Sequence, residues 1–328
     1  MTALSGTASA QSSVTIFGLL DTGIGHYRSG SEKVWKLGNP GTAPSRLGFR
    51  GSEDLGNGLS TEFWLEGAIA VDTGGMGAGN KFWNRRSTVG LKSVTFGELR
   101  MGRDNMAVYL TDWTYDAFYD TGVGGIGGAS GTPSVPGNTV PATTARIDNA
   151  VTYVLPAGLG GVFGQMQASF AEGDDTNKFR GGSLGYASGP WKVEGAYGET
   201  STVPAKFKYG VLAGLYDFGV VRLMGRYSRK ELGGSKFDNY SVGLQVPVGA
   251  GMIRASVVFN RGKDLEDGND STLYAIGYLY NLSKRTALFV QTAYVNNKGD
   301  AARALWGAPT GVAGESSSGY EFGIRHLF

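Results

Sequence analysis

Charged side chains stand at every second position in several short segments of the chain, where they alternate with apolar residues. Arg46 and Arg50, for example, alternate with Leu47 and Phe49. Successive side chains of a β-strand point to opposite faces, so the two arginines share one face. Fixed charges on a face that lines a water-filled space favour ions of the opposite sign. The chemistry predicted here is therefore electrostatic selection of solutes.

Acidic side chains supply the opposite charge in the neighbouring segments. Glu62 and Glu66 share the face opposite Phe63 and Leu65. Arg85 and Arg86 are adjacent, so at least one of them must point inward. The remaining candidates for a charged constriction are the basic Arg103 and the acidic Asp112, Asp116 and Asp120. Because the Debye length at physiological salt is about 8 Å, we expect only charges at the narrowest point to govern permeation.

Period-two alternation also runs through later segments, which predicts the strands that must position these charges. Outward-facing apolar sets are predicted for Trp191, Val193 and Tyr197, for Phe207, Tyr209, Val211 and Ala213, for Val221, Leu223 and Tyr227, for Tyr240, Val242, Leu244 and Val246, and for Tyr320, Phe322, Ile324 and Phe328. In a soluble sandwich such faces would turn inward, whereas a barrel in lipid places apolar residues outside and polar residues inside.

Turn signals fix the predicted number of strands. Short turns are predicted at 56–58, 95–97, 156–160, 188–190, 217–219, 247–251 and 281–285, and longer polar loops at 28–44, 72–81, 104–145, 172–178, 199–204, 229–236, 261–271 and 296–319. Their strict alternation predicts an all-β, antiparallel transmembrane barrel of sixteen strands. Outer-membrane barrels carry short periplasmic turns and long extracellular loops, so both termini are expected on the periplasmic side.

Composition agrees with this architecture and excludes other classes. The 328 residues are 41% hydrophobic with a net charge of +2, too balanced to indicate nucleic-acid binding. The longest apolar runs are only a few residues, far short of the roughly 20 of a spanning helix, so a membrane protein of this sequence must be a closed barrel. The sequence contains no cysteine, which excludes disulfides and thiol catalysis. No composition break divides residues 11–328, which predicts a single barrel domain.

The first ten residues are interpreted separately. Ala8, Ser9 and Ala10 form an A-x-A-like cleavage site before Gln11. Residues 1–10 are therefore expected to be the truncated end of a secretory signal peptide or an added leader.

Several longer motifs resemble those of a known family. They are residues 13–18 (SVTIFG), 45–56 (SRLGFRGSEDLG), 99–104 (LRMGRD) and 323–328 (GIRHLF). Over residues 11–328 the chain resembles the general diffusion porins of Gram-negative outer membranes, particularly the beta-proteobacterial and neisserial branch. This resemblance implies a sixteen-stranded homotrimer whose third loop, here 104–145, folds into the lumen. It also implies that Arg103 occupies the position at which an arginine enters the pore.

The predicted function is passive diffusion of ions and small hydrophilic solutes, without a reaction, a cofactor or a metal. The expected partners are identical subunits, membrane lipid and lipopolysaccharide. Arginines concentrated on consecutive segments favour a mild anion preference, although they could also form an unselective solvated wall or pin the third loop. The alternative is a substrate-specific porin for a small organic anion or a sugar, guided by Trp35, Trp64, Trp83, Trp113 and Tyr115. A barrel enzyme is disfavoured because neither of the two histidines has a serine plausibly beside it.

Overall fold

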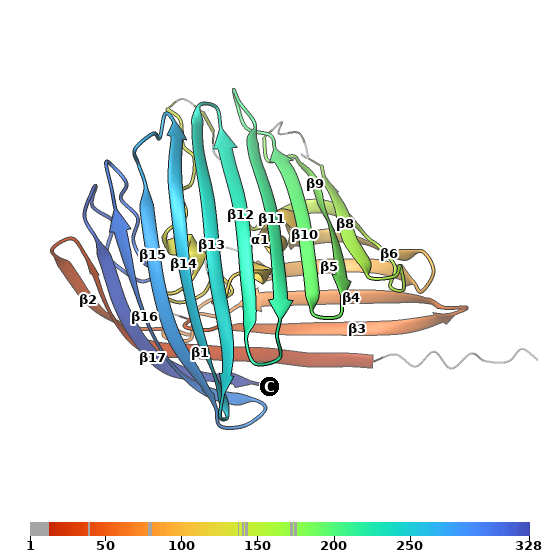
Figure 1. Cartoon of the computed structure of the whole chain (residues 1–328). Helices are drawn as coiled ribbons and strands as arrows, with labels where there is room; N and C mark the ends of the chain where they lie inside the picture. The colour runs from red at the N-terminus through yellow and green to blue at the C-terminus, as the bar shows by residue number, and fades with distance from the viewer. Residues whose placement is uncertain are drawn as a thin grey trace, which may run out of the picture.

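The computed structural model describes residues 13–38, 40–77, 81–136, 138–139, 141, 144–170, 173 and 176–328. These residues form one antiparallel β-barrel with a short helix, α1, behind the strands of its wall (Figure 1). Residues 1–10, predicted to be a leader, lie outside the described residues. In this part of the chain no helix is long and apolar enough to cross a bilayer.

The barrel is built from seventeen strands in chain order. They are β1 (Ser13–Ser29), β2 (Glu32–Leu37), β3 (Arg46–Gly56), β4 (Leu59–Ala68), β5 (Arg86–Ser93), β6 (Gly97–Asn105), β7 (Arg146–Val154), β8 (Val162–Ser169), β9 (Phe179–Ser188), β10 (Trp191–Thr200), β11 (Phe207–Asp217), β12 (Arg222–Leu232), β13 (Ser235–Val248), β14 (Gly251–Asp264), β15 (Ser271–Asn281), β16 (Thr286–Asn297) and β17 (Ser317–Leu327). Between β6 and β7 lie α1 (Ala107–Thr114) and a 3-10 turn, η1 (Ile126–Gly128).

The wall has sixteen positions, as predicted. From β3 to β17 each strand pairs with the next one in the chain, and β17 pairs with β1 to close the barrel. Strand β1 pairs with β2 along residues 24–29 and with β3 along residues 13–19. Strands β2 and β3 therefore share one position, separated by residues 38–45.

The seven predicted short turns all join neighbouring strands, but the predicted alternation with long loops is wrong at two places. In the 28–44 segment, β1 continues to Ser29 and a two-residue turn leads directly into β2. In the 229–236 segment, only residues 233 and 234 separate β12 from β13. Both turns use a glycine in the left-handed region, Gly30 (φ 56°) and Gly233 (φ 57°). The polar residues of these two segments belong to strand ends that extend beyond the apolar belt, so the connections themselves are short.

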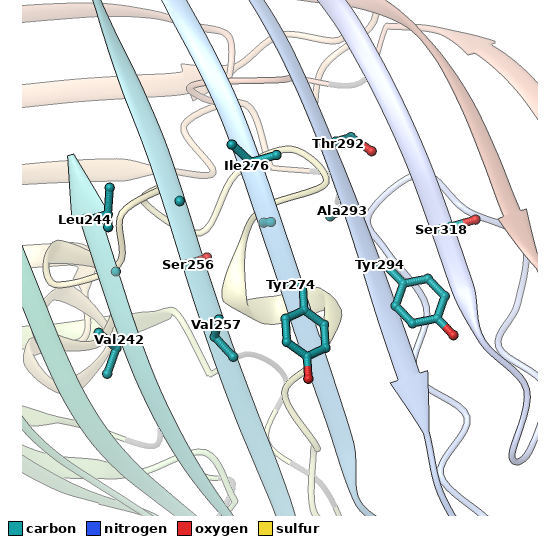
Figure 2. Close-up of a pocket in the computed structure, with 13 residues that line it drawn as sticks. Val242, Leu244, Ser256, Val257, Tyr274, Ile276, Thr292, Ala293, Tyr294 and Ser318 are labelled. Carbon is teal, nitrogen blue, oxygen red and sulfur yellow. The ribbon is translucent and has the colours of Figure 1, made fainter. Parts of the chain in front are cut away.

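The outer surface of the barrel is apolar. Tyr320, Phe322 and Ile324 of β17 are 47%, 50% and 44% exposed, whereas Glu321 on the opposite face is buried, as the alternation predicts. A groove of about 590 Å³ lies on this surface. The half-exposed rings of Tyr274 and Tyr294 line it (Figure 2). Such a wall is suited to contact with lipid acyl chains.

Strand β11 reverses the predicted orientation. Phe207, Tyr209 and Val211 were expected to face outward, yet they are buried at 2%, 2% and 6% exposure, and Leu212 between them is 64% exposed. Their side chains pack with Val108 of α1 in one hydrophobic cluster. The apolar face of β11 points inward because the third loop supplies an apolar partner inside the barrel.

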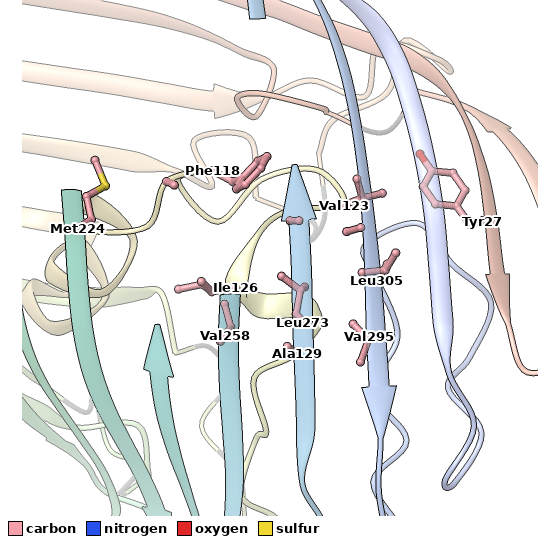
Figure 3. Close-up of a cluster of buried hydrophobic side chains, with 13 residues drawn as sticks. Tyr27, Phe118, Val123, Ile126, Ala129, Met224, Val258, Leu273, Val295 and Leu305 are labelled. Atoms are coloured by element: carbon pink, nitrogen blue, oxygen red, sulfur yellow. The ribbon is translucent and has the colours of Figure 1, made fainter. Parts of the chain in front are cut away.

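A second cluster anchors the remainder of the third loop, which folds into the lumen as predicted. Phe118, Val123 and Ile126 of the loop pack with Leu273 of β15 and Val295 of β16 (Figure 3). The loop therefore follows the inner wall from the β8–β11 side to the β12–β17 side. It narrows the lumen and leaves the inner faces of β3–β6 opposite to it.

Candidate pore constriction

Guanidinium groups surround one carboxylate on the inner wall where β3 begins, β4 ends and β5 begins. Arg85 Nε donates a hydrogen bond to Glu66 Oε1, and Arg46 Nε lies 3.8 Å from the same oxygen. Trp64 Nε1 donates to the other oxygen at 3.1 Å. The Arg46 side chain is 28% exposed and that of Glu66 only 11%. Basic atoms thus face the open space more than the carboxylate they cover.

Arg86 extends this basic group toward β6. Its Nε lies 3.8 Å from Asp104 Oδ1, and Arg100 Nε donates to Asp104 Oδ2 at 2.6 Å. The sequence required only one of Arg85 and Arg86 to face inward, but both do. Arg86 begins β5 opposite Glu66, while Arg85 precedes the strand and escapes its alternation.

Arg103 lies at the edge of this group, within electrostatic range of Arg146. A register shift lies between Gly102 and Asp104, and Arg103 pairs with Ser87 of β5. Its Nη1 lies 2.5 Å from Asp148 Oδ1, and its Nε donates to the carbonyl of Asn84 at 2.8 Å. The side chain therefore links β6 to β7 and to the loop between β4 and β5, which contains Asn84.

Arg50 and Glu62 occupy a lower level of the same wall. Arg50 lies four residues beyond Arg46 on the same face, about 13 Å closer to the short turns. Glu62 pairs with Lys92 at 3.0 Å. These two predicted residues thus belong to the lumen but are separated from the arginines around Glu66.

Of the third-loop acids, Asp112 turns toward the barrel wall, and Asp116 and Asp120 bind the backbone of the loop itself. Asp112 accepts hydrogen bonds from the Tyr209 hydroxyl and from Arg226 Nη1. Asp116 accepts the backbone N–H of Asp120 at 2.7 Å, and Asp120 accepts that of Gly127 at 2.7 Å. These carboxylates hold the loop in place. The predicted array of third-loop acids facing the arginines across the lumen is absent from these described residues.

The opposite side of α1 presents other groups to the lumen. Tyr109 and Trp113 are half-buried, on the helix face away from the buried Val108 and Asp112. Burial raises the pKa of Tyr109, and Arg146 and Arg85 lie within electrostatic range of its hydroxyl. Neutral side chains of the loop thus face the basic wall.

Besides Arg100, two arginines of this region were missed. Arg146, the first residue of β7, donates from Nε to the carbonyl of Arg85 at 3.2 Å. Arg325 of β17 lies within electrostatic range of Arg46. Arg325 stands on the predicted polar face of its strand, and Arg146 directly follows the third loop, so both signals were in the sequence.

The aromatic residues proposed as a substrate track are dispersed. Trp35 is 61% exposed on the outer wall, where its ring centroid lies 4.9 Å from that of His26. Tyr115 is buried and donates to Glu194 at 3.2 Å. Trp64 remains in the lumen, between Arg50 and Arg86, whose guanidinium carbons lie 5.3 and 4.8 Å from its ring centroid.

A sixteen-position barrel with an apolar exterior and a charged, loop-narrowed interior is a pore-forming barrel of an outer membrane. The profile of the family described as Gram-negative porin matches residues 1–300, and the chain belongs to this family. It functions as an outer-membrane channel for diffusion and is not an enzyme.

Individual relatives cover nearly the whole chain. The chain is 34% identical to outer membrane porin protein 32 of Delftia acidovorans over 99% of this chain and 97% of that protein. It is 26% identical to the major outer membrane protein P.IB of Neisseria meningitidis serogroup B, over 87% and 88%. The solved anion-selective porin from Comamonas acidovorans superimposes with a TM-score of 0.88 at 32% identity, covering 97% of this chain and 100% of that one.

Proposed function

We propose that this porin conducts small hydrophilic solutes and inorganic ions with a mild preference for anions, set by Arg46, Arg85, Arg86 and Arg146. The observation that carries the proposal is that two guanidinium groups, those of Arg46 and Arg85, share the single carboxylate of Glu66. Among the described residues, Glu66 is the one carboxylate paired with Arg46 or Arg85, and it is the less exposed partner. An uncompensated positive charge at the narrowest level attracts anions and repels cations.

The arrangement of the third loop also supports a preference for anions. Its acids are engaged by Arg226, Tyr209 and backbone N–H groups, so they add little negative potential to the open lumen. The anion selectivity named for the Comamonas acidovorans porin, a relative at 32% identity, is in line with this proposal. We assign a structural role to Arg103 because it is paired with Asp148. We place Arg50 and Glu62 outside the constriction.

The test is the reversal potential of single channels in a planar bilayer under a KCl gradient. Arg46→Gln and Arg85→Gln should each move it toward zero, and the double variant further. Arg261→Gln is the matched control, because it removes the same charge from an arginine paired with Asp270 near the loops. An unchanged potential in the double variant, or an equal shift in the control, would refute the proposal.

We also propose that the protein is a homotrimer with its termini in the periplasm and its long loops outside. The start of β1 and the end of β17 lie at the short-turn end of the barrel, since Ser13 pairs with Ser52 and Leu327 with Leu19. Lipid and lipopolysaccharide would contact the apolar outer wall. Native mass spectrometry tests the trimer, and protease accessibility of residues 298–316 on intact cells tests the orientation.

A further inference from the structure

Arg50 occupies an unusual setting in the lumen. Its guanidinium carbon lies 5.4 Å from the ring centroid of Phe17 and 5.3 Å from that of Trp64. The two rings contact each other edge to face at 5.0 Å. Aromatic faces attract a guanidinium and hold its plane in a fixed orientation, while its N–H edge stays available for hydrogen bonds.

The charge of Arg50 is left unpaired. No salt bridge joins it to a carboxylate within the described ranges, although Arg46, Arg85, Arg86 and Arg103 all have one. Glu62, on the neighbouring strand, is engaged by Lys92 at 3.0 Å. The Arg50 residue is exposed to the lumen, so it offers a cation that no carboxylate of the described residues neutralises.

Further groups complete the surroundings of Arg50. The strand register places Thr15 directly opposite on β1 and Trp64 directly opposite on β4. Thr15 is exposed and brings a hydroxyl donor to the same face. A guanidinium edge with a hydroxyl beside it matches a carboxylate, and the partly exposed rings of Phe17 and Trp64 match an apolar substituent.

We propose that Arg50, Thr15, Phe17 and Trp64 form a second anion-binding station, specific for small carboxylates with an apolar part. It lies about 13 Å from Arg46 along β3, on the short-turn side of the constriction. The proposal rests on the anion-conducting channel proposed above. A carboxylate that passes the constriction would pause at Arg50 before it leaves the pore.

The test measures how benzoate reduces the chloride current through single channels. Arg50→Gln should raise the half-blocking concentration about tenfold, the scale of a lost hydrogen-bonded charge contact. Arg50→Lys keeps the charge but loses the planar fork, and Phe17→Leu removes a ring that contacts Arg50 alone among the lumen arginines. Both should raise the concentration by about threefold. Arg222→Gln, which alters an arginine paired with Asp217 near the same end, should leave it unchanged.

Each result bears on one proposal. Unchanged block in Arg50→Gln would overturn the station, as would wild-type block in both Arg50→Lys and Phe17→Leu, because charge alone would then suffice. The reversal potential in KCl decides the constriction independently. If the wild type were not anion-selective, the function proposed above would fail, whereas the dependence of benzoate block on Arg50 would still decide the station.

Discussion

The buried pair of Asp112 and Arg226 should control whether the third loop stays on the wall. The side chains are 5% and 0% exposed, and Asp112 also accepts a hydrogen bond from Tyr209. Removing one partner of a buried ion pair typically costs about 3–5 kcal/mol, because the remaining charge stays buried without a counter-ion. In Asp112→Ala this cost should lower the free energy of opening the loop by a similar amount. Amide exchange across residues 107–120 should then accelerate by about 100-fold or more.

Hydrogen exchange of the detergent-solubilised protein, followed by mass spectrometry, measures this effect. The double variant Asp112→Asn with Arg226→Met replaces the ion pair by neutral groups and should recover most of the protection. Asp217→Ala is the matched control, since its pair with Arg222 is 38% and 39% exposed and is expected to contribute at most about 1 kcal/mol. Unchanged exchange in Asp112→Ala, or equal acceleration in Asp217→Ala, would refute the assignment of this pair as the anchor.

Two further predictions concern the same loop. Burial, together with the charge of Asp116, raises the pKa of Asp120 from 3.8 to about 7. The folded loop therefore retains a proton that the unfolded chain releases, so the stabilising contribution of Asp120 is fully present below about pH 4 and is lost as the pH rises to about 7. Asp120→Asn should flatten the change in urea midpoint between these pH values, and an unaltered profile would contradict this origin. Phe118→Ala empties a fully buried position and should cost about 3–5 kcal/mol, with noisier open-channel current; an unaffected urea midpoint would show that the loop is not anchored there.

Alternation of side chains was sufficient to predict much of the wall. Arg46 and Arg50 lie on the lumen face, as do Glu62 and Glu66, because no irregularity interrupts β3 or β4 before residue 54. Alternation did not place Arg103, which was assigned by the resemblance, and the register shift after Gly102 breaks the period of two at this point. A local bulge has no clear signature in a single sequence, so the position of this arginine required the structure.

The third loop shows the other limit of sequence reasoning. Its length and place predicted that it enters the lumen, but not which of its sides meets the wall. Asp112 turns toward the wall because Tyr209 and Arg226, some hundred residues away, meet it there. The apolar face of β11 points inward because it packs against Val108 of the same loop. Contacts between distant segments decide both orientations, and strand periodicity contains no information about them.

The most direct test of the central claim is the reversal potential of the wild-type channel under a KCl gradient, measured at low ionic strength, where screening is weakest. We expect an anion-selective potential that declines toward neutral as salt rises, because the guanidinium groups of Arg46, Arg85 and Arg86 outweigh the covered carboxylate of Glu66. A cation-selective or neutral potential at low salt would contradict it and would transfer control to acidic groups of the lumen.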